Sequence, residues 1–256
     1  IYATAGLYAY DKYGDKDGMV YYYDGMTWHE LPSPSSSQLG YRYIDANCMA
    51  FDSRESNHFF VGSKSGLLEY RNDTFINSYN IDNSKLTGIA GTYNPENCLI
   101  TSMGYDTSHN LWISQGWSEV PIKCFDSKGE WHAYSHTENT LTKLHGVDIQ
   151  GTFFSPTNKN LWSVNLHFHT SCLFKYDTVN DSLVTMTEFY NQDGTQVPCV
   201  GIYDIAEDLR GNIWLMTSSG PLYIKQGDVN EMKVTQHKVP RNDGTNYADY
   251  LLSNVD

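Results

Sequence analysis

Four copies of one short pattern constrain the fold of this chain more than any other feature of its sequence. Each copy has an asparagine, then any residue, then an aromatic residue that leads into an apolar run. The copies begin at Asn57, Asn110, Asn160 and Asn212. Their spacing of about 50 residues is typical of a β-propeller whose blades each contain four short strands.

The same series of elements surrounds each copy. A short apolar run and a polar turn precede it, as in Ile202–Ala206 and Asp208–Gly211. A third run, a second turn and a fourth run follow it, and Thr27–Leu31 and Glu130–Tyr134 are examples of the fourth run. Asp and Gly between such runs are typical of antiparallel hairpins. We therefore predict an all-β chain that forms one β-propeller domain over residues 1–256.

The repeat also predicts where the blades begin and end. Gly6–Asp11 matches the third strand of a unit, so the first blade is expected to lack its opening strand. Propellers close with four to eight blades, and bare sheet edges are unfavourable, so we expect about five blades that form part of a larger propeller. The chain is expected to be a mature product or a piece of a longer protein. The predicted blades cover residues 1–40, 41–80, 81–136, 137–190 and 191–245, and residues 246–256 lead into a next blade.

Composition and charge exclude several classes of function. The 256 residues include 17 Lys and Arg against 30 Asp and Glu, which gives a net charge of −13. Such a chain lacks the basic surface that nucleic acids require, and it does not favour anionic membrane surfaces. No apolar run reaches the roughly 18 residues of a transmembrane helix. The five cysteines form no CxxC pair, and we expect them to be buried as small apolar side chains.

The repeat resembles the two-component-regulator propeller repeat, in which Asn-x-Trp is followed by an apolar residue, Thr or Ser, and then Gly before the next strand. Asp208–Ile224 is the best copy, and Asp106–Ser114 and Asn57–Tyr70 are good ones. The copies that begin at Asn110 and Asn160 depart from the pattern at the glycine. The resemblance covers nearly the whole chain, and it is specific for the fold but weak for function.

Two groups of bacterial cell-envelope proteins carry such repeats: the periplasmic sensor regions of hybrid histidine kinases, which respond to carbohydrates, and the PorZ-like propeller proteins of the type IX secretion attachment complex. Gly6–Asp11 and Val239–Leu252 are more similar to the PorZ-like group. This resemblance implies a non-catalytic propeller in the periplasm or on the cell surface, associated with the outer membrane. It further implies a role in lipopolysaccharide-linked attachment of secreted cargo, with lipopolysaccharide or an oligosaccharide and other envelope or secretion-complex proteins as partners.

Two alternatives stay open at this point. The chain could be the carbohydrate-sensing periplasmic domain of a hybrid histidine kinase, or a polysaccharide-active enzyme on a propeller scaffold. Its many carboxylates allow the acid pair of a glycosidase. No Ser/His/Asp order, phosphate-binding glycine loop or HExxH motif is present, so we predict no catalytic residue, metal or cofactor.

Two long loops predict a ligand-binding surface. In the blades that contain Trp112 and Trp162, the loop between the second and third strands is longer than in the other blades and spans residues 114–121 and 165–171. The loops belong to adjacent blades and the same end of each, so we expect them side by side, where binding residues concentrate. An equally weighted alternative is that Trp117 only caps its blade. The predicted binding residues for a sugar or peptide are Trp117, Glu119, His167 and His169.

Other motifs favour structural roles. One aromatic residue per blade recurs in a fixed register, as sheet-on-sheet packing requires. The repeated asparagine is expected to be a turn residue that tolerates left-handed backbone. Asp11–Gly18 resembles a calcium loop weakly, because Tyr13 stands at the first ligand position. His167 and His169 have no identifiable third ligand for zinc. The expected packing aromatics are Phe59, Trp112, Trp162 and Trp214.

Overall fold

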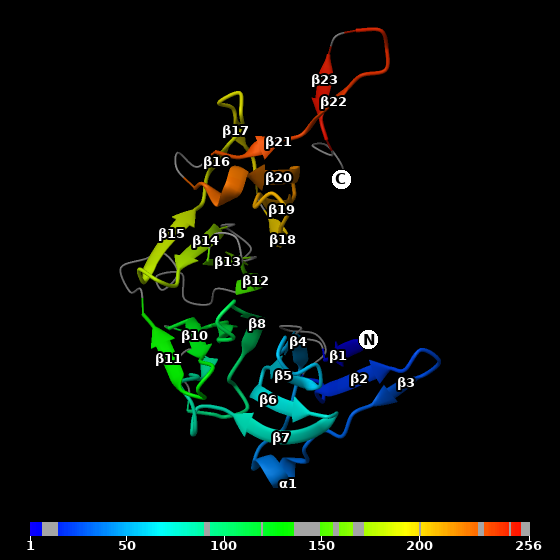
Figure 1. Cartoon of the computed structure of the whole chain (residues 1–256), viewed down its shortest axis with the longest axis vertical. Coiled ribbons are helices and arrows are strands. Elements are labelled where there is room, and N and C mark those ends of the chain that lie inside the picture. The colour runs from blue at the N-terminus through cyan, green and yellow to red at the C-terminus, as the bar shows by residue number, and fades with distance from the viewer. Residues whose placement is uncertain are drawn as a thin grey trace. The chain divides into compact units, whose positions relative to one another are not determined.

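The computed structural model of the chain consists of antiparallel sheets joined by turns and loops (Figure 1). It falls into two compact units, Ile1–Asp148 and Ile149–Asp256. The sheets are those of a β-propeller, so the predicted fold class is confirmed. Within the described part of the chain, no helix is long and apolar enough to cross a membrane. The structure describes residues 1–6, 15–89, 93–118, 120–135, 149–155, 159–165, 172–199, 201–229, 233–245 and 247–251.

Among its described residues, unit 1 contains three sheets in which strands adjacent in sequence pair antiparallel. The helix α1 (Ser36–Leu39) lies between the first and second sheets in the sequence, and a capping box at Ser35 begins it. The first sheet is β1 (Tyr2–Ala5), β2 (Met19–Tyr23) and β3 (Trp28–Glu30). The second is β4 (Ala46–Phe51), β5 (His58–Ser63), β6 (Gly66–Arg71) and β7 (Thr74–Tyr79). The third is β8 (Ile100–Tyr105), β9 (Leu111–Gln115), β10 (Ile122–Phe125) and β11 (Trp131–Tyr134).

The described part of unit 2 contains two four-stranded sheets, each followed in the sequence by a two-stranded hairpin. The first sheet is β12 (Ile149–Phe154), β13 (Asn160–Asn165), β14 (Cys172–Asp177) and β15 (Ser182–Met186), and its hairpin is β16 (Phe189–Tyr190) with β17 (Gln196–Val197). The second sheet is β18 (Ile202–Glu207), β19 (Ile213–Thr217), β20 (Gly220–Ile224) and β21 (Thr235–Gln236), with the 3-10 helix η2 (Lys225–Gly227) after β20. Its hairpin is β22 (Lys238–Pro240) with β23 (Ala248–Tyr250).

The first sheet differs from the sequence-based expectation in its third strand. Asp24, at the β2–β3 turn, occupies the position that Asp126 occupies at the β10–β11 turn. The third-strand position of this sheet is therefore filled by β2, and the assignment of Gly6–Asp11 to it was wrong. Gly6 follows β1, and residues 7–14 lie outside the described residues. The exact blade boundaries remain predictions.

One aspartate organises the repeated turn between the first and second strands of a sheet. Asp106 Oδ1 accepts the backbone N–H of Asn110, and its Oδ2 accepts Asn110 Nδ2 at 2.8 Å and Trp112 Nε1 at 2.9 Å. The same bonds recur around Asp208. Asn110 Oδ1 also accepts the N–H of Ser127 in the β10–β11 turn. The repeated asparagine therefore joins two turns, and the left-handed residue is its predecessor, His109, with φ of 62°.

The Asp106 network predicts a clear effect on stability. We expect Asp106→Ala to lower the free energy of unfolding by about 2 kcal/mol, because it leaves the amide of Asn110 and the indole N–H of Trp112 without their acceptor. Thr107→Ala, at an exposed residue of the same turn, should change it by less than about 0.5 kcal/mol. Urea unfolding followed by far-UV circular dichroism measures both. Equal stabilities of the two variants would contradict this role of Asp106.

At two of the repeated aromatic positions, the side chains of Phe60 and Trp162 pack between adjacent sheets, as predicted, but Phe60 is not the residue that the sequence indicated. The backbone N–H of Asp52 donates to the carbonyl of His58, whereas the N–H of Asp106 donates to that of Asn110. The β4–β5 turn is therefore longer than the β8–β9 turn. Phe60, which pairs with Ala50, therefore has the register of Trp112, which pairs with Gly104. The prediction of Phe59 for this position was wrong by one residue. Phe60, Trp112 and Trp162 are buried, whereas Trp214 is half-buried.

The cysteines behave as the sequence predicts. All five are free thiols; Cys98, Cys124 and Cys172 are buried, and the other two are partly buried. Burial raises the pKa of Cys98, Cys124 and Cys172 to about 12, so these thiols stay protonated and pack as small apolar groups.

Candidate functional site

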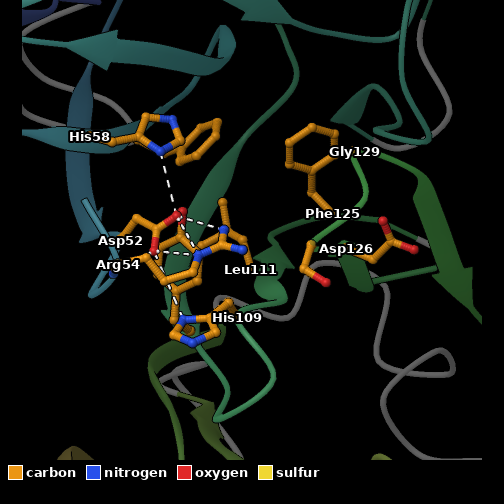
Figure 2. A pocket seen from close by; sticks show the side chains of 11 residues that line it. Asp52, Arg54, His58, His109, Leu111, Phe125, Asp126 and Gly129 are labelled. Atoms are coloured by element: carbon orange, nitrogen blue, oxygen red, sulfur yellow. Dashed lines mark hydrogen bonds and ion pairs between the residues drawn. The ribbon is translucent and has the colours of Figure 1, made fainter.

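A pocket of about 140 Å³ opens between the second and third sheets of unit 1 (Figure 2). Most of its lining comes from three turns at the same end of the strands: the β4–β5 turn, the β8–β9 turn and the β10–β11 turn. Its floor is apolar and includes Phe60 and Leu111. Charged and polar side chains from the turns surround this floor, which is the usual composition of a small-molecule site.

An aspartate–arginine pair forms one wall of the pocket. The carboxylate of Asp52 is 2% exposed and receives Arg54 Nε at 3.1 Å and a second guanidinium nitrogen at 2.7 Å. The Arg54 backbone N–H also donates to it. These bonds outweigh the effect of burial and lower the pKa of Asp52 to about 2. The two residues are close because the turn places them two positions apart, so the guanidinium is held in place at the pocket.

A network of polar contacts connects Asp52 of this wall to the strands of the second sheet. His58 Nδ1 lies 3.5 Å from Asp52 Oδ2, and His58 Nε2 lies 2.8 Å from Glu69 Oε1. Tyr79 donates its hydroxyl to Glu69 Oε2 at 2.8 Å, and burial together with Glu69 raises the pKa of Tyr79 to about 12. The network is largely buried and connects β5, β6 and β7, so it fixes the position of the imidazole of His58.

The remaining walls are more open. His109 Nδ1 lies 3.2 Å from Ser53 Oγ and 3.9 Å from Asp52 Oδ1, and its imidazole is about one-third exposed. Figure 2 shows Asp52, Arg54, His58 and His109 gathered on one side, and Phe125, Asp126 and Gly129 on the other. The pocket therefore combines hydrogen-bonding side chains with the ring of Phe125. Such a set is suited to hydroxyl groups on a compact polar molecule of about the size of one saccharide unit.

Three possible metal ligands lie beside the pocket, but their geometry has a structural explanation. Asp126, Glu130 and His132 each place one ligand atom within 4.8 Å of the others. Asp126 already accepts two backbone N–H groups and bonds His132 Nε2 at 2.9 Å, contacts that lower the pKa of its carboxyl. The same Asp–His pair recurs in the β2–β3 hairpin, where Asp24 bonds His29 at 2.7 Å. The Asp–His contact is therefore a recurring feature of this type of hairpin, which explains why the two side chains lie close together.

Of the four binding residues predicted from the sequence, the structure describes Trp117, which does not line this pocket. Trp117 follows β9, is half-buried and has φ of 56°. Leu111 at the start of β9 lines the pocket, whereas Trp117 follows the end of β9. The turn of Trp117 therefore lies at the other end of the strands from the pocket. Glu119, His167 and His169 lie outside the described residues. Their predicted placement beside Trp117 stays a prediction.

Sequence reasoning missed Asp52, Arg54, His58 and His109. The available signal was the turn between Asp52 and His58, which is longer than the turns that begin at Asp106 and Asp208. The partners in the adjacent sheet carried no comparable local signal.

Comparisons with known proteins bear on the fold. No protein-family model matches the chain, and no curated protein matches it. The solved structure of PorZ, a surface component of the type IX secretion system of Porphyromonas gingivalis, is 19% identical, with a TM-score of 0.79 over 98% of this chain and 35% of that one. The extracellular domain of the putative hybrid two-component system BT3049 of Bacteroides thetaiotaomicron is 17% identical, with a TM-score of 0.56 over 92% of this chain and 29% of that one.

A third solved structure has a comparable similarity. The extracellular domain of the putative one-component system BT4673 of B. thetaiotaomicron is 13% identical, with a TM-score of 0.58 over 99% of this chain and 28% of that one. The chain thus spans 35% or less of each of these three structures. The similarity to PorZ and to the two Bacteroides domains, which the repeat predicted, is confirmed at the level of the β-propeller fold.

Proposed function

We propose that this chain is a non-catalytic binding propeller of a bacterial cell-envelope protein, with a PorZ-like role in type IX secretion and in lipopolysaccharide-linked attachment of secreted cargo. The observation that carries the proposal is the TM-score of 0.79 over 98% of the chain with PorZ, which is described as an essential bacterial surface component of that secretion system. The extracellular assignment of the two Bacteroides domains supports a periplasmic or cell-surface location.

The second candidate function is a carbohydrate-sensing domain of a hybrid histidine kinase. Its support is the similarity to the BT3049 extracellular domain, with a TM-score of 0.56. This value is lower than the one for PorZ, so we rank the sensor second. The two roles differ in their phenotype. Loss of an attachment component leaves secreted cargo detached from the cell, whereas loss of a sensor alters transcription in response to a saccharide.

In either role, we place ligand contact at the pocket of Asp52, Arg54 and His109. The support is chemical: a fixed guanidinium, a partly exposed imidazole and an aromatic ring converge on a space that accepts one polar unit, such as a terminal saccharide. The loop of Trp117 is the alternative contact surface that the sequence predicts.

The test is complementation of a deletion strain in the native organism. Wild-type protein should restore cargo attachment, and His109→Ala should restore less than about one-fifth of it through loss of a ligand contact. His29→Ala, at a half-buried hairpin histidine outside the pocket, should restore it fully. Cell fractionation with immunoblotting measures attached and released cargo.

Three outcomes would redirect the proposal. Normal attachment in the deletion strain, with an altered transcriptional response to saccharides, would favour the sensor. Full function of His109→Ala together with loss of function in Trp117→Ala would move the ligand contact to the Trp117 loop. Turnover of a polysaccharide by the purified chain would contradict a non-catalytic role.

A further inference from the structure

The pocket of unit 1 offers a ligand more hydrogen-bond donors than acceptors. Arg54 uses Nε and one terminal nitrogen of its guanidinium to bond Asp52, and its other terminal nitrogen bonds no residue that the structure describes. Tyr105 also lines the pocket, and its hydroxyl has no hydrogen-bond partner among the described residues. Burial, together with the charge of Asp52, raises the pKa of Tyr105 well above its usual value, so this hydroxyl keeps its proton and can act as a donor.

The acceptors of the same pocket are largely occupied. The carboxylate of Asp52 receives the backbone N–H and the guanidinium of Arg54, and His58 Nδ1 lies 3.5 Å from it. Asp126 Oδ1 accepts two backbone N–H groups at 2.9 and 2.8 Å, and Asp126 Oδ2 bonds His132 Nε2 at 2.9 Å. A ligand therefore matches this pocket best when it presents an acceptor oxygen to the unused donors.

The charges around the pocket favour a neutral acceptor over an anionic one. Arg54 is the one arginine or lysine among the described lining residues, and the carboxylate of Asp52 already neutralises it at 2.7 Å. Asp126 adds a second carboxylate to the lining, and Glu69 lies behind the lining, 2.8 Å from His58 Nε2. A carboxylate or phosphate on the ligand would face this excess of negative charge, whereas a carbonyl oxygen accepts the same hydrogen bonds without that repulsion.

An apolar patch lies across the pocket from the guanidinium. Phe125 is half-buried, its ring centroid is 5.9 Å from that of Phe60, and Leu111 completes the patch. Figure 2 shows Phe125 on the opposite side of the pocket from Arg54. A group that fits between them has a carbonyl oxygen at one end and a small apolar end at the other. The acetamido group combines a carbonyl with a methyl group in this way, and a pocket of about 140 Å³ has room for it.

We propose that this pocket binds the acetamido group of an N-acetylated amino sugar, whose carbonyl oxygen accepts hydrogen bonds from Arg54 and Tyr105 and whose methyl group packs on Phe125. The amide N–H of the ligand donates to the hydroxyl of Ser127, which also lines the pocket. The partly exposed imidazole of His109 contacts a hydroxyl of the sugar ring. This class of ligand rests on the proposed function, which places a saccharide contact at the pocket.

Saturation-transfer difference NMR tests the proposal with the protein purified from the organism that produces it. The probes are the methyl glycosides of N-acetylglucosamine and N-acetylgalactosamine, of the parent hexoses glucose and galactose, and of glucuronic acid, which carries a carboxylate. At least one acetamido glycoside should bind about tenfold more tightly than its parent hexose, which leaves the donors and the apolar patch without a partner. Its acetyl methyl protons should receive the strongest saturation from the protein. The glucuronide should bind no more tightly than the glucoside.

Removal of one hydroxyl locates the binding site. Tyr105→Phe keeps the ring and removes the proposed donor, so the affinity for the acetamido glycoside should fall about fivefold while the affinity for the parent hexose stays unchanged. Tyr223→Phe removes the hydroxyl of another half-buried strand tyrosine, in unit 2, and should leave both affinities unchanged. Far-UV circular dichroism confirms that both variants are folded.

Several results would overturn the proposal, and they differ in what they mean for the proposed function. Equal affinities for the acetamido glycosides and their parent hexoses, or tighter binding of the glucuronide, would exclude the acetamido ligand and leave a saccharide contact in place. An acetamido affinity that Tyr105→Phe does not change would mean that the group binds elsewhere. If no glycoside binds while His109→Ala still loses cargo attachment, the ligand is not a saccharide of these classes, but the pocket remains the contact. If no glycoside binds and His109→Ala keeps full attachment, the ligand contact at this pocket fails as well.

Discussion

Trp162→Ala is expected to lower the free energy of unfolding by about 4 kcal/mol, because it removes a fully buried indole from the core of unit 2. Trp162 is 0% exposed and lies in a core with Val164, Leu173, Ile205 and Ile213, which come from both sheets of unit 2. Alanine would leave a cavity in this core, and the rigid strands around it cannot close the space. Urea unfolding followed by far-UV circular dichroism measures the change without depending on tryptophan fluorescence.

Trp214→Ala is the matched control, because Trp214 has the same register in the next sheet. Trp214 is only half-buried, so we expect a loss of about 2 kcal/mol or less. Equal losses in the two variants would contradict the packing described for unit 2.

The fold could be predicted from the sequence because the information is local and repeated. The turn aspartate, the asparagine and the aromatic residue lie within seven residues of one another in Asp106–Trp112 and again in Asp208–Trp214, and their side chains bond one another directly. A pattern that forms its own contacts can be recognised without knowledge of the rest of the chain.

The register of Phe60 could not be predicted in the same way. Alignment of Asn57 with Asn110 assumed turns of equal length, but the structure closes one turn at His58 and the other at Asn110. Because strand side chains alternate between faces, a shift of one residue exchanges the faces. Both Phe59 and Phe60 are apolar and buried, so the sequence does not distinguish the two registers.

The pocket was not predictable for a different reason. Its walls are separated by long stretches of sequence: Arg54 comes from the second sheet, and His109 and Asp126 come from turns of the third. Their convergence depends on how two sheets stack, which no short motif encodes. Loop length, which predicted the Trp117 surface, detects insertions within a blade and is insensitive to sites formed between blades.

The third sheet also contains a buried lysine whose effect on stability the repeat pattern does not predict. Lys123 lies in the middle of β10 and is 1% exposed. Its register is that of Leu68 in β6 and Leu222 in β20, both buried apolar residues. Among the described residues, no carboxylate forms an ion pair with it. Burial lowers the pKa of Lys123 to about 8, and the nearby thiol of Cys98 opposes this only in part.

Lys123→Leu is therefore expected to raise the free energy of unfolding at pH 7 by about 3 kcal/mol. At this pH the ammonium is charged in both the folded and unfolded chain, so the cost of its burial is fully present in the wild type. Leucine removes that cost and matches the residues at this register in β6 and β20. Lys128→Leu, at an exposed residue of the β10–β11 turn, should change stability by less than about 0.5 kcal/mol.

The dependence on pH separates the loss of charge from a simple gain in packing. Between the folded pKa of about 8 and the unfolded value of 10.5, the folded wild type releases its proton first, so the unfolded chain binds more protons and the stability of the wild type rises with pH. The advantage of Lys123→Leu should accordingly be largest below pH 8 and shrink steadily up to pH 10.5. Urea unfolding at intervals across this range measures the difference. An advantage that stays constant with pH would mean that packing, and not the buried charge, accounts for the gain.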